Sequence, residues 1–302
     1  MADNTIITCE NSTAPANIDK NEVVGPCDLK CKFNYTYGIY SPNIANNGNY
    51  ISLNYSGKSN PVLFNDLKYE VQEIRIYRPS LHKYQGSTVD GEILIIHGGS
   101  GKNLIVSIPI KVGDKTDKGS TQLSDLITEV ASRAPTEGSS ITASMGDFSL
   151  RNFIPDKKSF FSYNGTLPYG PCNGSYSYIV YDSEDALNIS QTKMTSLRNI
   201  ITGTRVAVKP TTLFFNKRGA NTSSLQDDIY IDCQPVGSDG QILVNESAMS
   251  STTTTGSSMN MEQIEPFLYT ISAIILAVGL GYGFHYVFSK FKDRNTDPAG
   301  NK

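Results

Sequence analysis

The sequence predicts a mainly β (α+β) fold: a central twisted sheet with a few surface helices, followed by one C-terminal transmembrane helix. Three observations support this prediction. Short alternating runs dominate residues 50–110 and 176–230, one segment has helical spacing, and an uninterrupted apolar run lies near the C-terminus. With 302 residues and a formal net charge of −3, the chain is long enough for one large domain with appendages.

The alternating runs are bounded by Gly, Asn and Pro, as the strands of a β-rich domain are. In the run Glu73-Ile74-Arg75-Ile76-Tyr77, the two isoleucines face one way and the other three side chains face the opposite way. This period of two predicts a strand whose two faces lie in different surroundings.

One helix is predicted in the middle of the chain. Its apolar residues recur at helical spacing, namely at Leu123, Leu126, Ile127 and Val130. Either Ser120 or Thr121 precedes this pattern and could cap the helix, because a side-chain hydroxyl accepts a hydrogen bond from a backbone N–H of the first turn.

The composition divides the chain into four parts. They are a β-rich ectodomain (1–246), a Ser/Thr-rich stalk (247–265), a transmembrane anchor (266–289) and a short basic and polar tail (290–302). Residues 267–288 contain no Asp, Glu, Lys or Arg, and at about 1.5 Å per residue they can span a hydrocarbon core of about 30 Å. Gly279 and Gly283 form a Gly-x-x-x-Gly pair, which is compatible with a homo-oligomer formed through this helix.

The N-terminal residues show no basic region followed by an apolar stretch, so we expect no signal peptide. A single span close to the C-terminus is then expected to act as a tail anchor that inserts after translation. This topology places the large domain initially on the cytosolic side.

Residues 73–80, Glu-Ile-Arg-Ile-Tyr-Arg-Pro-Ser, resemble the zinc-binding strand Gln-Phe-His-Phe-His-Trp-Gly-Ser of the α-carbonic anhydrases. Further segments resemble that family in the same order along residues 9–232. They are Pro-Ala-Asn-Ile (15–18), Asn-Asn-Gly-Asn-Tyr (46–50), Thr-Val-Asp (88–90), Glu-Ile-Leu-Ile-Ile-His (92–97), Lys-Val-Gly (111–113), the loop 161–172 and Phe-Asn-Lys-Arg (215–218). The common order makes the resemblance strong, and it implies the family's central twisted sheet.

The departures from the family concern its metal site. The three zinc histidines of the family fall at Arg75, Tyr77 and Leu94, and the threonine that orients the zinc-bound hydroxide falls at Pro168. A guanidinium offers donors only and stays protonated, so it cannot ligate a cation. We therefore predict no metal, no cofactor and no enzyme activity.

The resemblance also suggests a new role for Arg75. A buried guanidinium needs a carboxylate partner, because an uncompensated buried charge is very costly. We predict that Arg75 fills the former metal position and pairs with Glu92, Glu73 or both. The alternative is that Arg75 points into an open cleft and binds an anionic ligand.

The chain has five cysteines, and the resemblance implies a Cys9–Cys172 disulfide, since secreted family members carry paired cysteines at these places. Such a bridge closes a very long loop and constrains the unfolded chain strongly. Cys27 and Cys31 are near enough in sequence to form a second disulfide, and Cys233 would then have no cysteine to pair with.

The architecture as a whole resembles carbonic-anhydrase-like virion membrane proteins of poxviruses, which lack a signal peptide, carry a C-terminal span and have lost the zinc ligands. Proteins of that class bind the cell-surface glycosaminoglycan chondroitin sulfate. The resemblance implies a virion surface protein of a large DNA virus, anchored by a single C-terminal span with its large domain on the outer face, that attaches to host glycans.

The charge balance bears on the partner. Residues 1–265 carry 22 Lys and Arg against 27 Asp and Glu, because four of the 26 basic and two of the 29 acidic residues lie beyond residue 265. A sulfated glycan needs a local positive patch, so we expect a ligand of this kind to bind at cations on the cleft rim or in clusters. A neutral sugar would instead stack on a tyrosine. The candidate ligand-binding residues are Arg78, His82, Lys83, Tyr169, Lys217 and Arg218. The expected partner is a host glycan, sulfated or neutral, or a host protein, and not a nucleic acid.

Two other functions compete with attachment. The acidic balance and the Gly-x-x-x-Gly pair are compatible with a structural virion protein that links the membrane to a capsid or to sister subunits. An active carbonic anhydrase ranks third, because it requires a zinc site rebuilt from His82, His97 and a carboxylate.

Overall fold

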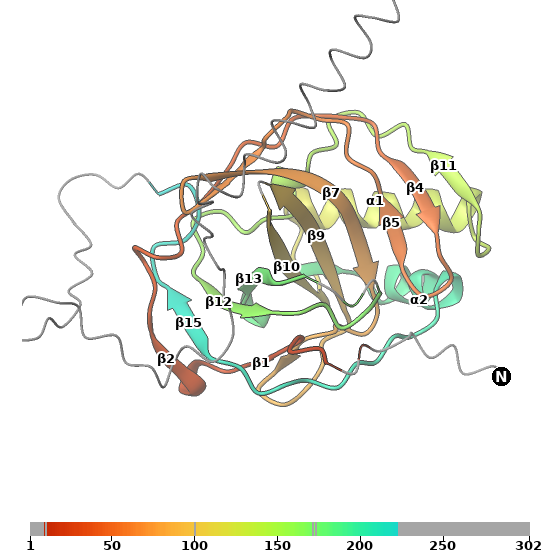
Figure 1. The fold of residues 1–302 in the computed structure, drawn as a ribbon. Coiled ribbons are helices and arrows are strands. Elements are labelled where there is room, and N and C mark those ends of the chain that lie inside the picture. The colour runs from red at the N-terminus through yellow and green to blue at the C-terminus, as the bar shows by residue number, and fades with distance from the viewer. Residues whose placement is uncertain (1–8, 10, 100, 171, 173, 223–302) are drawn as a thin grey trace, which may run out of the picture. The chain divides into compact units, whose positions relative to one another are not determined.

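The structure, a computed structural model, describes residues 9, 11–99, 101–170, 172 and 174–222 (Figure 1). Its main feature is one large mixed sheet, which has 13 strands within the described part of the chain. The central path runs β11 (Ser140–Thr142), β4 (Asn43–Asn46), β5 (Ile51–Leu53), β7 (Leu67–Tyr77), β9 (Gly91–Gly99), β10 (Lys102–Val112), β13 (Tyr176–Tyr181), β12 (Phe160–Gly165), β15 (Leu213–Asn216) and β2 (Val23–Pro26). Three strands join at the side, β14 (Leu187–Ile189), β3 (Phe33–Tyr35) and β6 (Val62–Phe64), while β1 (Asn17–Ile18) pairs separately with β8 (Lys83–Tyr84).

The long strands β7, β9 and β10 form the centre of the sheet and pair antiparallel. Their residues alternate between two cores. Ile74, Ile76 and Ile93 belong to the larger cluster on the helix side, and Tyr77 and Leu94 belong to a second cluster on the other side. Because both faces are covered, β9 is an almost continuous apolar run and not an alternating one.

Two α-helices pack against each other and cover the side of the larger cluster (Figure 1). The helix α1 (Lys118–Arg133) buries Leu123, Leu126, Ile127 and Val130, as predicted. Its N-cap is Asp117, whose carboxylate accepts a hydrogen bond from the Ser120 backbone N–H at 2.7 Å, so the predicted cap at Ser120 or Thr121 is corrected. Ser120 lies inside the first turn, where its hydroxyl accepts from the Asn188 backbone N–H.

The second helix, α2 (Gln191–Ile200), is capped by Ser190 and buries Met194, Leu197 and Ile200. Three short 3-10 helices complete the described elements, η1 (Lys20–Glu22), η2 (Leu150–Asn152) and η3 (Ser183–Asp185). The prediction of a mainly β twisted sheet with a few helices is confirmed.

The predicted stalk, transmembrane anchor and tail, together with Cys233, lie outside the described residues. Among the helices of the described ranges, none is long and apolar enough to cross a membrane.

The structure pairs Cys9 with Cys172, as the resemblance implies, and Cys27 with Cys31. The first bridge joins residues 163 positions apart. It ties the segment that contains Cys9 and Thr13, which we call the N-terminal strap, to the loop that follows β12. Hydrogen bonds reinforce this attachment, since the Cys9 backbone N–H donates to the Pro168 carbonyl at 3.2 Å and Thr13 bonds to Thr166.

Candidate functional site: a closed former metal site and a basic groove

The sheet brings together the three positions that the resemblance assigns to zinc ligands. Arg75 on β7 lies directly opposite Leu94 on β9, and Tyr77 follows two residues along the same face of β7. We call these three residues the former metal site. Pro168, at the hydroxide-orienting position, is buried and has no hydroxyl to orient a ligand.

Arg75 fills this site and is held from several sides. Its Nε and Nη2 donate to Glu73 Oε2 at 2.8 and 2.7 Å, and its Nη1 donates to the Tyr77 hydroxyl at 3.3 Å. The rings of Tyr50 and Tyr169 lie 4.7 and 4.6 Å from the guanidinium carbon, a cation–π arrangement. Burial disfavours the charged form, but Tyr77 and Glu73 more than offset it and raise the pKa of Arg75. The predicted pairing with Glu73 is confirmed.

Of the two predicted partners, Glu92 does not pair with Arg75, because Glu92 is bound elsewhere. Glu92 lies opposite Tyr77, two pairs further along the strands than Arg75 and Leu94, near the loop that follows β7. Its Oε1 accepts from His82 Nδ1 at 2.5 Å and from the Ser107 hydroxyl. Its Oε2 accepts from the backbone N–H groups of Leu81 and His82 at 2.7 and 3.2 Å.

These hydrogen bonds explain why the Glu92 carboxyl is ionised and why His82 is held in the interior. Burial raises the pKa of the Glu92 carboxyl, but His82 and Ser107 outweigh it, so the pKa is lowered overall. The other ring nitrogen of His82 bonds to the Tyr163 hydroxyl at 2.7 Å, and the side chain is fully buried. The prediction that His82 binds a ligand at the cleft rim is therefore corrected.

The donors around the former metal site do not fit zinc. Within the described ranges, no group of three or more His, Cys, Asp and Glu side chains gathers to hold a metal ion. His82 lies on the Glu92 side of the sheet, whereas His97 shares the opposite face of β9 with Ile93 and Ile95. Both ring nitrogens of His97 are hydrogen-bonded, Nε2 to the Tyr37 hydroxyl at 2.8 Å and Nδ1 to the Leu104 carbonyl at 3.3 Å. The two histidines therefore cannot meet at one metal ion.

His97 supplies a prediction on pH dependence. Burial lowers its pKa to about 4, whereas the unfolded chain titrates near about 6.5. The unfolded state therefore binds more protons between these values, and stability falls as the pH drops through this window. Between pH 7.5 and 5 we expect the free energy of unfolding to fall by about 2 kcal/mol from this group, measured by urea unfolding.

The control for this prediction is His97→Gln, which removes the titrating group. Its pH dependence should be weaker than that of the wild type by the same amount. Glu92 does not interfere, because a carboxylate with a lowered pKa loses its contribution only as the pH falls below about 4.5. Equal pH dependence in the two proteins would contradict the assignment.

A different region concentrates positive charge. Two adjoining hollows, of about 560 and 550 Å³, share Thr88 and Arg205 in their linings. We call them together the basic groove. Its cations are Arg78 at the end of β7, Lys83 on β8, Lys111 on β10, Arg198 in the last turn of α2, and Arg205.

Few negative groups balance these cations. Asp90 is the one carboxylate among the groove-lining residues; it lies 3.7 Å from Arg198 and also accepts from the Val112 backbone N–H. Arg78 is fixed by two carbonyls, with Nε donating to Ile201 at 2.8 Å and Nη2 to Arg198 at 3.2 Å. Burial and the charge of Arg198 lower the pKa of Arg78, as expected where like charges are held together.

The six predicted ligand-binding residues therefore do not form one site. Arg78 and Lys83 line the basic groove, whereas Tyr169 is buried against Arg75 and cannot serve as an open platform for a sugar. Lys217 and Arg218 directly follow β15, and of the two Arg218 lines a different hollow, which the Cys27–Cys31 loop borders. Lys111, Arg198 and Arg205 were not predicted from the sequence, because residues so far apart in the chain share no local pattern.

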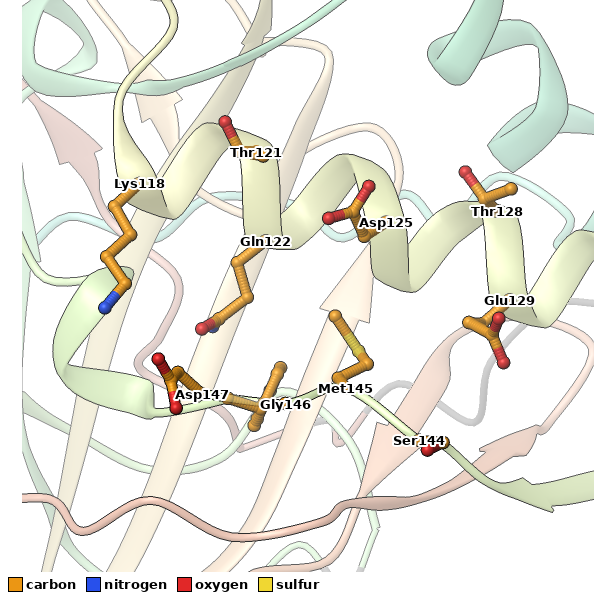
Figure 2. A pocket seen from close by; sticks show the side chains of 11 residues that line it. Lys118, Thr121, Gln122, Asp125, Thr128, Glu129, Ser144, Met145, Gly146 and Asp147 are labelled. Atoms are coloured by element: carbon orange, nitrogen blue, oxygen red, sulfur yellow. The ribbon is translucent and has the colours of Figure 1, made fainter.

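A further hollow of about 570 Å³ lies between α1 and residues 144–148. Figure 2 shows Asp125 and Glu129 projecting from α1, with Asp147 on the facing segment, and Lys118 is the one cation in the lining. This acidic groove (Asp125, Glu129 and Asp147) has the wrong sign for a polyanion.

Comparison with known proteins agrees with this architecture. A family model described as eukaryotic-type carbonic anhydrase matches residues 4–222. The chain is 23% identical to dioscorin DB3L of Dioscorea polystachya over 57% of its own length, and 21% identical to a carbonic anhydrase of Neisseria gonorrhoeae over 59%. It covers 62% and 66% of those two relatives, which is less than two thirds of their lengths.

Solved structures share the fold at low sequence identity. A dioscorin complexed with ascorbate is similar with a TM-score of 0.58 and 19% identity, over 68% of this chain and 86% of that one. The α-carbonic anhydrase of Thermovibrio ammonificans, solved with the inhibitor sulfanilamide, gives a TM-score of 0.57 and 17% identity, over 68% and 87%. With the family model covering most of the described chain, this protein belongs to the eukaryotic-type carbonic anhydrase family.

Proposed function

We propose that this protein is a non-catalytic surface protein of a virion membrane that attaches to anionic glycans on the host cell. The observation that carries the proposal is the basic groove, where five cations line two neighbouring hollows and one carboxylate opposes them. The replaced zinc positions support the absence of catalysis, because neither Arg75 nor Leu94 can ligate a metal ion.

The groove suits an extended polyanion for two reasons. Its two hollows share Thr88 and Arg205 and so lie side by side, which suits a ligand with several anionic groups along its length. Guanidinium groups bind sulfate and carboxylate groups through paired, charge-assisted hydrogen bonds, which a rigid Arg78 presents in a fixed orientation. A domain that is acidic overall can therefore still attract a polyanion locally.

The double variant Arg198→Glu/Arg205→Glu tests this proposal. Both side chains are exposed, so the change should leave the fold intact and invert the charge of the groove. We expect the full-length protein in detergent to bind immobilised sulfated glycosaminoglycan with a dissociation constant that rises with salt. The double variant should bind about 100-fold more weakly, at about tenfold for each of the two arginines replaced.

The matched control is Lys68→Glu/Lys102→Glu, which makes the same change of charge at exposed positions at the starts of β7 and β10. It should retain binding within about threefold, because its charges lie outside the groove. Equal losses in both variants would show that net charge, not the groove, governs binding. Salt-resistant binding that survives the groove variant would favour a neutral glycan or a protein partner, and no binding at all would favour the structural virion role.

A further inference from the structure

Exposed apolar side chains gather at one end of the sheet. Of the seven large apolar residues that are exposed within the described ranges, five lie around the hollow of about 700 Å³ that the Cys27–Cys31 loop borders. Leu29 and Phe214 line this hollow, Leu63 and Leu67 lie on the β6–β7 hairpin beside Phe64 in its wall, and Val24 lies on β2 next to β15 (Figure 1). We call these five residues the apolar patch. Single exposed apolar residues are ordinary, whereas a cluster of them marks a surface that another surface covers.

Basic side chains surround the apolar patch. Gly219, which follows Arg218, packs so closely on the neighbouring segment that a Cβ there would lie 2.7 Å from the Lys158 carbonyl oxygen. Lys and Arg outnumber Asp by seven to three in the four segments around the patch, which are residues 28–32, 65–68, 156–158 and 217–218. Lys158 pairs with Asp185 at 3.0 Å, and a positive excess remains when this carboxylate is counted as well.

The combination of apolar and basic side chains suits the surface of an anionic lipid bilayer. Apolar side chains enter the boundary between headgroups and acyl chains, about 5–10 Å deep, while Lys and Arg keep their charges at the level of the lipid phosphates. A sulfated glycan would match the charges but leave the apolar side chains in water. The basic groove differs in this respect, because Val112 is the one exposed large apolar residue in its lining.

The chain leaves the described ranges beside the apolar patch. The Asn221 backbone N–H donates to the Phe33 carbonyl at 2.9 Å, and Phe33 pairs with Phe64 in the wall of the hollow. The predicted anchor begins at residue 266, so the 43 residues from 223 to 265 connect it to this end of the domain. Such a tether holds the patch near the bilayer at a high effective concentration, and a weak surface contact is then enough to keep it there.

The central strands carry the basic groove away from the apolar patch. β7 begins at Leu67 in the patch and ends at Tyr77, and the next residue, Arg78, lines the groove. Ten steps of about 3.3 Å place the two ends of this strand about 30 Å apart. A domain that rests on the patch therefore points the groove away from the bilayer.

We propose that the apolar patch and the cations around it rest on the anionic lipid surface of the membrane in which the chain is predicted to be anchored. The contact fixes the orientation of the domain and presents the opposite end to the surroundings. It does not depend on glycan attachment, because it involves neither Arg198 nor Arg205, and the domain is held in this way whatever the basic groove binds.

An introduced tryptophan tests the contact, because the chain contains none of its own. Full-length Phe214→Trp and Val112→Trp are each reconstituted in vesicles of phosphatidylcholine and phosphatidylserine, with or without bromine on the acyl chains. The two side chains are 38% and 36% exposed, so both positions should accept the larger ring. We expect bromine to quench about half of the emission of Phe214→Trp, since its ring enters the interface, and to leave Val112→Trp unchanged.

Charge variants separate the lipid contact from the groove. Adding Lys157→Glu/Lys217→Glu to Phe214→Trp should reduce the quenching toward the level of Val112→Trp, because two exposed cations then become anions that face the lipid phosphates. Adding the groove variant Arg198→Glu/Arg205→Glu instead should leave the quenching unchanged.

Four outcomes would overturn the proposal. They are equal quenching at positions 214 and 112, no quenching at either, failure of the protein to float with the vesicles, and emission of Phe214→Trp that shifts to shorter wavelength without quenching. The last outcome would show that protein covers the apolar patch, either residues 223–265 or a second copy of the chain.

Discussion

Replacing Glu92 with alanine is expected to lower the free energy of unfolding by about 3–5 kcal/mol. The carboxylate is fully buried and accepts four hydrogen bonds, from His82 Nδ1, the Ser107 hydroxyl and two backbone N–H groups. Alanine leaves all four donors buried without an acceptor, and such groups bear the full cost of their desolvation. Urea unfolding at pH 7 measures the effect.

Two further variants show whether the loss comes from this network. Glu92→Gln should lose less, because its amide oxygen can still accept from the backbone N–H groups of Leu81 and His82. Glu129→Gln removes a partly exposed carboxylate paired with Arg133 on α1 and should change stability by less than about 1 kcal/mol. If Glu92→Ala unfolds within about 1 kcal/mol of the wild type, the network does not hold the loop after β7 in place.

Removing the long disulfide should have an effect of similar size. The Cys9–Cys172 bridge spans 163 residues, and the loop-entropy model gives it about 5 kcal/mol of stabilisation. We therefore expect Cys9→Ser/Cys172→Ser to lower the free energy of unfolding by about 4–5 kcal/mol, measured by urea unfolding of the otherwise unreduced protein.

The second bridge provides an internal control. Cys27 and Cys31 are four residues apart, so the same model gives their disulfide only about 2 kcal/mol. Hydrogen bonds from Asn216 to the Cys31 carbonyl and from Asn65 to the Lys30 carbonyl also hold this short loop. Losses of equal size in the two double variants would show that loop length does not govern the stabilisation.

The long bridge also connects the strap at Cys9 with the ring that covers Arg75. Tyr169 lies three residues before Cys172, on the loop whose Pro168 carbonyl accepts from the Cys9 backbone N–H. Through these bonds the N-terminal strap holds one wall of the former metal site. Removal of the bridge is therefore expected to loosen the position of Tyr169 as well as to lower stability.

Local patterns determined much of this protein. The period of two in residues 73–77 predicted two faces with different surroundings, and the structure places Ile74 and Ile76 in one core and Tyr77 in the other. Helical spacing located α1, because a helix on a sheet must bury one stripe of side chains. The side chains at positions 75 and 94 predicted the loss of the family's zinc ligands before any geometry was known, since ligation depends first on the type of atom available.

Only the tertiary structure decided which groups meet. Glu92 and Glu73 were both candidates for Arg75, and the choice followed from the loop after β7, which brings His82 and two backbone donors to Glu92. The basic groove joins Arg78 to Arg205 across more than a hundred residues of chain. Such pairings leave no periodic trace in the sequence, because they arise from strand order and loop path. The sequence by itself therefore determined the fold class and the side chains present at the former metal site, and the packing of distant segments decided where the charges gather.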